Sequence, residues 1–437
     1  MAGVGAAFLL AMSLVPASAA GLVGARSAAR AYSAGPTATG ASIERAANAA
    51  RLTFDISMPV VAHAYVLADP ARVIVDLPEI GFFLDPAIGR PARATRGRPE
   101  AAGLASSFRF GRIAPGRSRI VIDLAGPARI VRAESETTSA DGAARLVIEL
   151  ASTDAESFRA AARAARAAQM LASAVQPAPQ IAVASRAAPG LPLVYLDPGH
   201  GGVDVGAVGS GGVEEKTIVL DFARQLAAKL ERGGKARAIL TRGDDTFIPL
   251  AQRVKIARDG GAALFVSIHA DTLNETSVHG ATVYTLSDRA SDAEAARLAA
   301  KENAADRAGG LADSEDTVDV NDILFDLTRR ETRAMSHRFA QSLASEWKSA
   351  GDLNKNPVRS AGFVVLKAPD VPSALLELGY LSSDKDLAKL ASPAWREEAA
   401  AKVAAAIERY FTERPRDADD RTASVGAFAT PSAAIAR

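Results

Sequence analysis

The sequence predicts two domains of different class: an all-β, sandwich-like domain, then an α/β domain whose mainly parallel sheet is covered by helices. Short runs of alternating apolar and polar residues over 43–152 have the period of strands buried on one face. Runs that are apolar throughout, separated by amphipathic helical segments, fill 191–413 and are typical of strands buried on both faces. A length of 437 residues also favours several domains, because domains average about 150 residues.

The composition is that of an average globular protein. Hydrophobic residues make up 48% and charged residues 23% of the chain, which argues against wholesale disorder and against a polytopic membrane protein. The 51 basic and 50 acidic side chains nearly cancel, which argues against a surface built to hold nucleic acid. Because cysteine is absent, a metal ion has to be held by Asp, Glu or one of five histidines: His63, His200, His269, His279 and His337.

The first residues have the features of a signal peptide. An apolar stretch at 6–15 is followed by Pro16 and a small-residue Ala-Ser-Ala site at 17–19. A buried or membrane-anchoring segment is the alternative, but the stretch is shorter than the roughly 20 residues that span a bilayer. We therefore expect a signal peptide over 1–19 and an exported, periplasmic product without stable membrane insertion.

A five-residue pattern recurs in the β-rich domain. An arginine, three mainly apolar residues and an acid occur together four times, from Arg51 to Asp55, Arg72 to Asp76, Arg119 to Asp123 and Arg145 to Glu149. Each copy places charges at the ends of a strand, and glycine and proline punctuate the gaps, which predicts a sandwich or small barrel. His63 stands alone there, and a lone histidine in a strand is more often structural than a ligand. We expect this domain to bind and not to catalyse.

Two segments differ in composition from the domains. Residues 153–190 are rich in alanine and end in a proline-rich stretch, so we place a linker there, helical in its alanine-rich part and semi-extended at its end. Residues 414–437 lack an apolar period and are expected to form a disordered tail.

Chemically active side chains stand at strand ends in the α/β domain, where ligands bind in open parallel sheets. The strand at 193–196 leads into the turn Asp-Pro-Gly-His200-Gly-Gly, the strand at 262–268 into Ser-Ile-His269-Ala, and Glu377 follows an apolar strand at 374–376. Glu215 lies just before a predicted helix at 217–230. Two imidazoles and a carboxylate with an open fourth position form the ligand set of a hydrolytic zinc centre. We therefore expect His200, Glu215 and His269 to bind zinc.

Each of these signals also has an ordinary structural explanation. Asp-Pro-Gly is a common turn, and Glu215 could simply favour a helix N-terminus through the helix dipole. Asp197, Asp204 and Asp271 are competing oxygen donors. Glu377 is harder to explain, because it interrupts an apolar strand and a buried carboxylate needs a metal, a proton or a partner.

The order of the motifs resembles one enzyme family. Besides the two histidine motifs, the chain contains Glu215-Lys216, Thr241-Arg242 with Asp245 and Arg253, and Leu-Glu377-Leu-Gly-Tyr-Leu-Ser. Over almost all of 191–413 this set is similar to the zinc-dependent N-acetylmuramoyl-L-alanine amidases of the amidase_3 type. The β-rich front is similar to the AMIN domain that precedes this catalytic domain in exported division amidases of the AmiC type.

The resemblance implies a substrate, a cofactor and a catalytic residue. It implies hydrolysis of the peptidoglycan amide between the lactyl group of N-acetylmuramic acid and L-alanine of the stem peptide, in wall remodelling and daughter-cell separation. Zinc is the implied cofactor. Glu377 would take a proton from the attacking water and deliver it to the leaving nitrogen. The family usually has Asn where this chain has Asp271, and the AMIN-like domain is implied to bind peptidoglycan at the septum.

A helix between two strands is a candidate inhibitory element. Ser291-Asp-Ala-Glu294 has the form of a capping box and precedes a helical stretch that ends at Gly309-Gly310. In the resembling division amidases an inserted helix places a glutamate in the open metal position until a partner moves it, here an activator of the LytM-factor type. Glu302 is the better candidate for that glutamate and Glu294 the weaker one, with a solvated surface helix as the alternative. The apolar segment 320–327 could dock an activator or belong to the core.

Other functions use similar residues. A zinc peptidase or a carbohydrate deacetylase has comparable ligands, and product analysis separates both from an amidase. A non-catalytic peptidoglycan-binding protein with a degenerate amidase fold would fail to bind zinc. It is disfavoured because all three predicted ligands and Glu377 are present.

Overall fold

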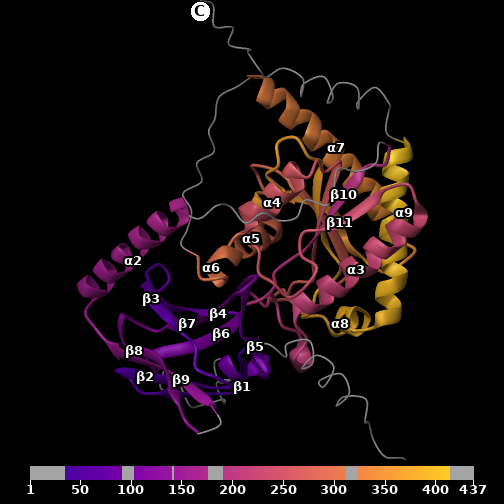
Figure 1. Ribbon diagram of the computed structural model, residues 1–437. Coiled ribbons are helices and arrows are strands. Elements are labelled where there is room, and N and C mark those ends of the chain that lie inside the picture. Colours follow the sequence, from indigo (N-terminus) through magenta and orange to yellow (C-terminus); the bar gives the residue numbers. More distant parts are fainter. Residues whose placement is uncertain (1–34, 91–102, 140–141, 176–189, 312–322, 414–437) are drawn as a thin grey trace, which may run out of the picture.

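The computed structural model describes residues 35–90, 103–139, 142–175, 190–311 and 323–413. These residues form a β-rich part and an α/β part that lie against each other (Figure 1). The predicted signal peptide at 1–19 and the predicted tail at 414–437 lie outside the described residues. None of the described helices has the length and hydropathy that crossing a membrane requires.

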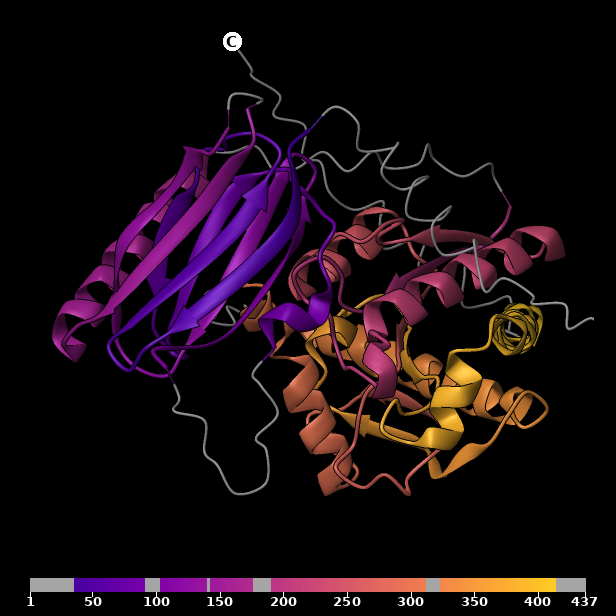
Figure 2. The ribbon, with the colours of Figure 1, turned by 90° about the horizontal axis from the view of Figure 1, so that it is seen from below.

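Two mainly antiparallel sheets form the β-rich part, which we call the β domain (Figure 2). The outer sheet has the order β5-β1-β2-β9-β8, formed by Gly81–Phe82, Thr37–Arg45, Ala49–Ile56, Ala144–Ser152 and Ala128–Thr137. The inner sheet, which contacts the α/β part, has the order β3-β4-β7-β6, formed by His63–Leu67, Arg72–Pro78, Arg117–Leu124 and Ala105–Ala114. Alternate side chains such as Phe54, Val75 and Ile120 are buried in one shared core.

The repeated arginine-to-acid pattern lies at the centre of both sheets. Strands β2 and β9 pair antiparallel in the outer sheet, as β4 and β7 do in the inner sheet. The register sets Arg51 opposite Glu149 in the first pair and Arg119 opposite Asp76 in the second, and both form ion pairs. Opposite charges on directly opposed residues stabilise antiparallel strands, so the pattern helps to fix the register of each sheet.

The alanine-rich part of the predicted linker is a helix that packs on the β domain. Residues Ala155–Val175 form α2, which contacts β3. Phe158 and Ala162 of this helix are buried with the core of the two sheets. The remaining linker residues at 176–189 lie outside the described residues.

The second part is a three-layer α/β domain. Its sheet has the order β11-β10-β12-β15-β13-β14, formed by Arg237–Leu240, Leu193–Pro198, Leu264–His269, Ser373–Glu377, Ala281–Leu286 and Leu353–Ala361. Neighbouring strands run parallel except β13 and β15, which run antiparallel, so the sheet is mixed. The parallel strands β10, β12 and β15 therefore end at the same edge.

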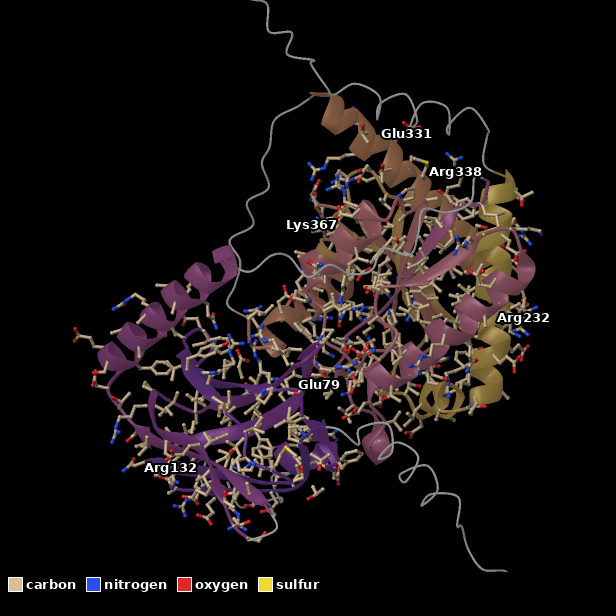
Figure 3. The ribbon with its side chains drawn as sticks, in the orientation of Figure 1. Glu79, Arg132, Arg232, Glu331, Arg338 and Lys367 are labelled. Atoms are coloured by element: carbon tan, nitrogen blue, oxygen red, sulfur yellow. The ribbon has the colours of Figure 1, made fainter. Side chains whose placement is uncertain are left out.

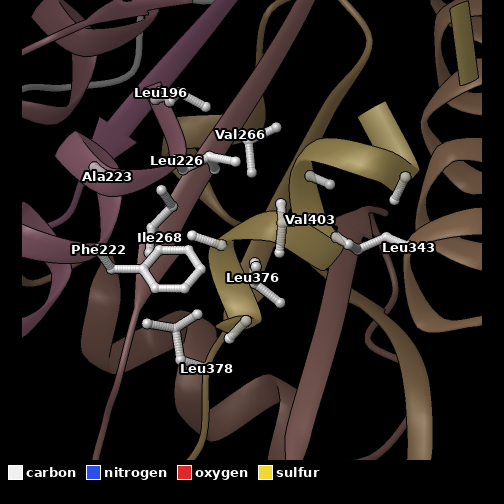
Figure 4. Close-up of a cluster of buried hydrophobic side chains, with 14 of the residues drawn as sticks. Leu196, Phe222, Ala223, Leu226, Val266, Ile268, Leu343, Leu376, Leu378 and Val403 are labelled. Carbon is white, nitrogen blue, oxygen red and sulfur yellow. The ribbon is translucent and has the colours of Figure 1, made fainter. Parts of the chain in front are cut away.

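Helices cover both faces of this sheet. One face carries α3 (Glu215–Gly233), α7 (Ile323–Trp347) and α9 (Pro393–Glu413), with α8 (Asp384–Leu390) beside α9. The other carries α4 (Leu250–Asp259), α5 (Ala293–Glu302) and the short helix η3 (Val364–Leu366). Figure 4 shows part of the first core, where Val266, Ile268 and Leu376 of the sheet cluster with Phe222 and Val403. Burial on both faces explains why the central strands, such as β12 and β15, are mainly apolar.

The start of α5 differs from the sequence prediction. Asp292 caps the helix, because its Oδ1 accepts a hydrogen bond from the Ala295 N–H at 2.9 Å. Glu294 forms an ion pair with Arg359 at 3.1 Å. The predicted capping box with Ser291 as the cap is therefore wrong: the neighbouring aspartate accepts the hydrogen bond that the box assigns to the serine, and the glutamate has another partner.

The helix also ends earlier than the glycine pair suggests. Asn303 follows the last residue of α5, and the short helix α6 (Ala305–Ala308) begins two residues later. The Asn303 side chain donates to the Gly362 carbonyl and accepts from the Val364 N–H, both at 2.8 Å. These bonds tie the end of α5 to a distant segment, which sequence periodicity does not reveal.

A buried carboxylate joins several elements at the edge of the sheet. Asp197, at the end of β10, accepts hydrogen bonds from Thr241 at 2.6 Å and from Ser267 of β12 at 2.8 Å. Arg253 of α4 forms an ion pair with it at 2.9 Å. Both partners of this ion pair are buried, so each depends on the other for compensation of its charge.

We predict that Asp197→Ala lowers the free energy of unfolding of the α/β domain by about 3–5 kcal/mol, because the Arg253 guanidinium stays buried without its counter-charge. Urea unfolding followed by circular dichroism measures this change. Asp259→Ala is the control, since it removes the exposed partner of Lys255 and should cost less than about 0.5 kcal/mol. Equal midpoints for the two variants would contradict the structural role of Asp197.

Candidate metal centre

The three predicted metal ligands lie close together at the carboxyl edge of the sheet. His200 is in the turn after β10, His269 is the last residue of β12, and Glu215 is the first residue of α3. Glu215 Oε1 lies 3.2 Å from His200 Nε2 and 3.1 Å from His269 Nδ1. All three side chains are buried. Because β10 and β12 are adjacent parallel strands, their carboxyl ends lie at the same edge of the sheet. This arrangement brings His200 and His269 together, although they are 69 positions apart in the sequence.

Glu302, at the end of α5, joins the same cluster. Its Oε2 lies 3.4 Å from His200 Nε2 and 3.1 Å from His269 Nδ1. Ligand atoms of His200, His269 and Glu302 all lie within 4.8 Å of one another, so these groups could hold one metal ion. Glu294 lies in the first turn of α5 and pairs with Arg359. Of the two glutamates considered from the sequence, the one that reaches the imidazoles is Glu302.

The turn that carries His200 has an unusual backbone conformation. His200 has a φ of +58°, in the left-handed region that non-glycine residues rarely adopt. Arg242 donates to the carbonyls of Pro198 and Gly199 at 2.9 and 2.8 Å, and Arg253 donates to those of Pro198 and His200 at 2.8 and 2.7 Å. Strained backbone persists where its surroundings fix it, and these two buried arginines fix this turn.

Two further residues of the family-like motifs hold the same turn. Lys216 Nζ donates to the Gly202 carbonyl at 2.9 Å and forms an ion pair with Asp245 at 2.8 Å. Asp245 in turn accepts a hydrogen bond from the Gly202 N–H at 2.7 Å. Gly202 has a φ of +55°, a conformation that favours glycine. These residues shape the backbone from which the His200 imidazole projects.

Asp204 determines which nitrogen of His200 faces the cluster. Its Oδ2 lies 2.8 Å from His200 Nδ1, and both side chains are buried. The other nitrogen, Nε2, lies near Glu215 and Glu302 and has no hydrogen-bond partner in the part of the chain that the structure describes. Metal-binding histidines commonly donate their second nitrogen to a carboxylate, which fixes the tautomer and raises the basicity of the first.

The other oxygen donors and histidines have different surroundings. Asp197 is held in the ion pair with Arg253, and Asp271 forms an ion pair with Lys301 of α5. The remaining histidines are exposed or half-buried and do not belong to the cluster: His63, His279 and His337.

Glu377 is a second kind of carboxylate at this edge. It is the last residue of β15, opposite His269 in the sheet register, and fully buried. Its Oε2 accepts a hydrogen bond from the Asp271 N–H at 3.1 Å, and its Oε1 has no hydrogen-bond partner among the described residues. Burial raises the pKa of Glu377 well above its ordinary value; His269 opposes this rise, while the carboxylates of Asp271 and Glu215 add to it. A raised pKa makes this carboxyl a stronger base than an ordinary glutamate, which suits a group that takes up a proton.

Negative charge dominates the surroundings of the imidazoles. Burial lowers the pKa of His269, but the Glu302 and Glu215 carboxylates outweigh burial and raise this pKa to about 10. Burial also opposes charge on His200, whose pKa is nevertheless raised well above its ordinary value by Glu215, Asp204 and Glu302. The site therefore stabilises positive charge. A divalent cation meets the same requirement, because imidazole and carboxylate are common ligands of such ions.

Little space is left beside the imidazoles. The cavity lined by His200, His269 and Glu302, together with neighbouring residues, measures about 10 Å³. That volume holds about one water molecule. A hollow of about 430 Å³ borders the cluster at Asp271 and Lys301. The cluster itself is closed to a molecule as large as a peptide.

Imidazole and carboxylate groups around one point, with a buried carboxylate beside them, are typical of metal-dependent hydrolases. The α/β domain matches the family Amidase_3, described as N-acetylmuramoyl-L-alanine amidase, over residues 194–409. A relative named N-acetylmuramoyl-L-alanine amidase AmiA, from Salmonella typhimurium, is 40% identical over 220 residues, which are 50% of this chain and 76% of the relative. The chain belongs to the N-acetylmuramoyl-L-alanine amidase family.

Other relatives are longer than the matched region. An amidase named AmiC from Escherichia coli is 40% identical over 222 residues, which are 51% of this chain and 53% of the relative. The chain thus spans about half the length of that relative. A solved structure of the amidase AmiC2 of Nostoc punctiforme is similar over 51% of this chain and 99% of that chain, with 30% identity and a TM-score of 0.39. The family match does not include the β domain.

Two roles in the site have no counterpart among the sequence predictions. From the sequence, Asp204 is expected only as a competing metal ligand. In the structure it holds the His200 ring by a hydrogen bond. Its position four residues after the histidine is the sequence signal that could have indicated this role. Lys301 precedes Glu302, and its pairing with Asp271 depends on how α5 packs.

We predict that Asp204→Asn weakens the affinity of this site for a divalent cation by about 10–100-fold, with zinc as the probe, because the neutral amide no longer fixes the His200 tautomer or raises its basicity. Competition titration with a chromogenic chelator measures the affinity. Asp370→Asn is the matched control, as it changes an exposed partner of Arg258 in the same domain. Parent-like affinity for Asp204→Asn would show that this carboxylate does not act on the metal ligand.

Proposed function

We propose that this protein is a zinc-dependent N-acetylmuramoyl-L-alanine amidase that cleaves the bond between N-acetylmuramic acid and L-alanine of the peptidoglycan stem peptide. The observation that carries the proposal is the convergence of His200, Glu215 and His269 beside Glu377, in a chain that belongs to this amidase family. We also propose that it acts in the periplasm, in wall remodelling and daughter-cell separation.

Zinc would be held by His200 Nε2, His269 Nδ1 and Glu215 Oε1, the atoms that face one another in the cluster. When bound, zinc supplies Lewis acidity to the amide carbonyl and to a water molecule. Glu215 Oε2 also accepts the Ala207 N–H at 2.8 Å, and its Oε1 accepts the Ala270 N–H at 2.9 Å. These bonds fix the carboxylate in place before a metal arrives.

Glu377 would move the proton that the reaction requires. Water adds its oxygen to the amide carbon, and the bond between that carbon and the alanine nitrogen breaks. The nitrogen cannot leave as an anion, so the proton released by water must reach it. Glu377, fully buried and with one oxygen free of hydrogen bonds to described residues, accepts this proton and delivers it. The products are the lactyl carboxylate and a stem peptide with a free amine.

Glu302 would keep this site closed. It contacts both imidazoles and is 4% exposed, and Lys301 beside it pairs with Asp271. A substrate amide cannot enter while α5 stays in this position. We propose that an activator of the LytM-factor type displaces α5. The segment 320–327, considered as a docking site, lies partly outside the described residues, and the side chains of the rest are not described.

The β domain would have a binding role, as an AMIN-like domain that attaches the enzyme to peptidoglycan. Its support is the two-sheet architecture and the absence of a metal-binding cluster from its described residues. The four copies of the arginine-to-acid pattern are part of its sheets.

We predict that Glu377→Gln lowers turnover by about 10²–10⁴-fold while zinc content stays at the parent level, because the amide can neither take up nor deliver the proton. Turnover is measured as release of free stem peptides from purified sacculi, in the parent and in the Glu302→Ala background, and zinc content by elemental analysis. His269→Ala is the comparison variant and should lose zinc as well.

The same digestion separates the competing functions. Cleavage within the stem peptide would identify a peptidase, and released acetate a deacetylase. A chain that binds no zinc and releases nothing would be a binding protein. Near-normal turnover of a folded Glu377→Gln variant would remove this residue from the mechanism.

We predict that Glu302→Ala raises basal cleavage of sacculi by about 10–100-fold. The reason is that the closed state loses a hydrogen bond to a charged group, which contributes about 1.5–3 kcal/mol to its stability. Ala300→Ser, an exposed change on the same helix, is the control and should leave the basal rate unchanged. Unchanged or lower activity in a well-folded Glu302→Ala variant would argue against closure by this residue.

A further inference from the structure

The β domain holds the chain just beyond the inhibitory helix. Arg109 of β6 donates to the Ala308 carbonyl at 2.8 Å, and Arg119 of β7 donates to the Gly309 and Gly310 carbonyls at 3.0 and 3.2 Å. Arg72 of β4 donates to the carbonyls of residues 307 and 311. Three strands of the inner sheet thus contact five consecutive carbonyls at and beyond the end of α6. Figure 1 shows α6 beside this sheet.

Two of these arginines are buried, unlike the arginine at the same position of the pattern in the outer sheet, and Arg109 is partly exposed. Arg72 is 1% and Arg119 is 5% exposed, whereas the side chain of Arg51, at the same position of the repeated pattern in β2, is 52% exposed. Arg119 is also paired with Asp76 at 2.6 Å, and Arg109 with Asp123 at 2.6 Å. A buried guanidinium is costly unless it is paired and hydrogen-bonded, and the carbonyls of the α6 segment accept hydrogen bonds from these groups.

An apolar contact surrounds these hydrogen bonds. Ile74 and Val121 of the inner sheet are buried with Val203 and Phe247 of the α/β domain. Gly310 has a φ of +73°, and a Cβ there would lie 2.7 Å from Ile74 Cδ1, so the main chain at Gly310 packs against side chains of the inner sheet with no room for a side chain of its own. Side chains fill the boundary between the domains in Figure 3, which labels Glu79 there and Arg132 on the outer sheet.

The held segment is directly connected to Glu302. Only two residues separate the end of α5 from the start of α6. Asp306 of α6 accepts a hydrogen bond from the Leu250 N–H at 2.9 Å, and Asn303 bonds to the segment at 362–364. Withdrawal of Glu302 from the imidazoles therefore requires either that the carbonyls leave the arginines or that this short connection deforms.

We propose that the β domain is an inhibitory clamp, in which Arg72, Arg109 and Arg119 hold the α6 segment and thereby keep Glu302 in the metal site. The three arginines are positioning residues, since they act through the main chain of residues 307–311. Separation of the inner sheet from α6 releases α5. This inference rests on the proposed closure of the site by Glu302 and adds a role for the β domain beyond attachment to the wall.

The test is hydrogen exchange in the full, zinc-loaded chain, read on peptides that cover residues 293–311. In Arg109→Ala and Arg119→Ala, exchange of these amides should accelerate by about tenfold or more, the change expected for losing a hydrogen bond to a charged group. Arg51→Ala is the matched control, because Arg51 starts the same pattern in the outer sheet, and it should leave this exchange unchanged. Peptides covering 117–124 report whether the inner sheet stays folded.

A second readout is basal cleavage of sacculi. Arg109→Ala should raise it, and the double variant with Glu302→Ala should be no more active than Glu302→Ala alone, because both changes act on the same closed state. Arg109 is partly exposed, with 23% of its side chain accessible, so its replacement tests the clamp even where Arg119→Ala unfolds the inner sheet.

The outcomes separate this inference from the proposed function. Parent-like exchange over 293–311 in a folded Arg109→Ala chain overturns the clamp, whatever the activity. Accelerated exchange with no cleavage of sacculi, even by Glu302→Ala, supports the clamp and refutes the proposed amidase activity. Activation by Glu302→Ala without any effect of Arg109→Ala on exchange or cleavage supports the amidase and refutes the clamp.

Discussion

Buried negative charge beside two imidazoles is the constraint on which the rest of the structure depends. Glu215, Glu302 and Glu377 are each at most 4% exposed, and carboxylates are costly to bury without compensation. The imidazoles of His200 and His269 are the neighbouring groups that can become positive, and the carboxylates raise the pKa of both. A bound cation would take over this role and leave the imidazoles neutral, as ligands. The same imbalance of charge that makes the cluster costly therefore makes it suitable for a metal ion.

The scaffold gives this cluster a fixed geometry. His200 lies on a backbone that few residues adopt, and the donors that keep it there belong to Arg242 and Arg253, on segments distant in sequence. Asp197 balances the charge of Arg253 from within the sheet. The turn, the buried ion pair and the metal ligands are thus one connected unit. We therefore expect a change in the ion pair to alter the position of the imidazole as well as the stability of the domain.

The parts of the fold that could be predicted are those with a local signal. Apolar runs indicated the central strands of the α/β domain, and short motifs at their ends indicated His200, His269 and Glu377, whereas the polar edge strand β14 was not predicted. The cap of α5 could not be predicted in this way, because the partner of Glu294 is Arg359 and the break at Asn303 depends on residues 362–364. Arg72 and Arg119 contact the segment 307–311, which is about 190 or more positions away in the sequence. Sequence periodicity describes local structure and cannot predict a contact between such distant residues. The repeated pattern predicted strands but not which copies are buried.

The closed state has two groups of restraints, and they respond to different events. Lys301 with Asp271 and Glu294 with Arg359 are ion pairs within the α/β domain, so they persist when the β domain moves away. The arginine contacts belong to the interface, and only separation of the inner sheet removes them. A ligand shifts such an equilibrium by no more than the difference between its affinities for the two states. A wall polymer bound to the outer sheet would leave the clamp intact, whereas one that engages Arg72 or Arg119 has to displace α6. If the β domain binds the wall as proposed, the sheet that carries the binding surface would decide whether attachment and activation are coupled.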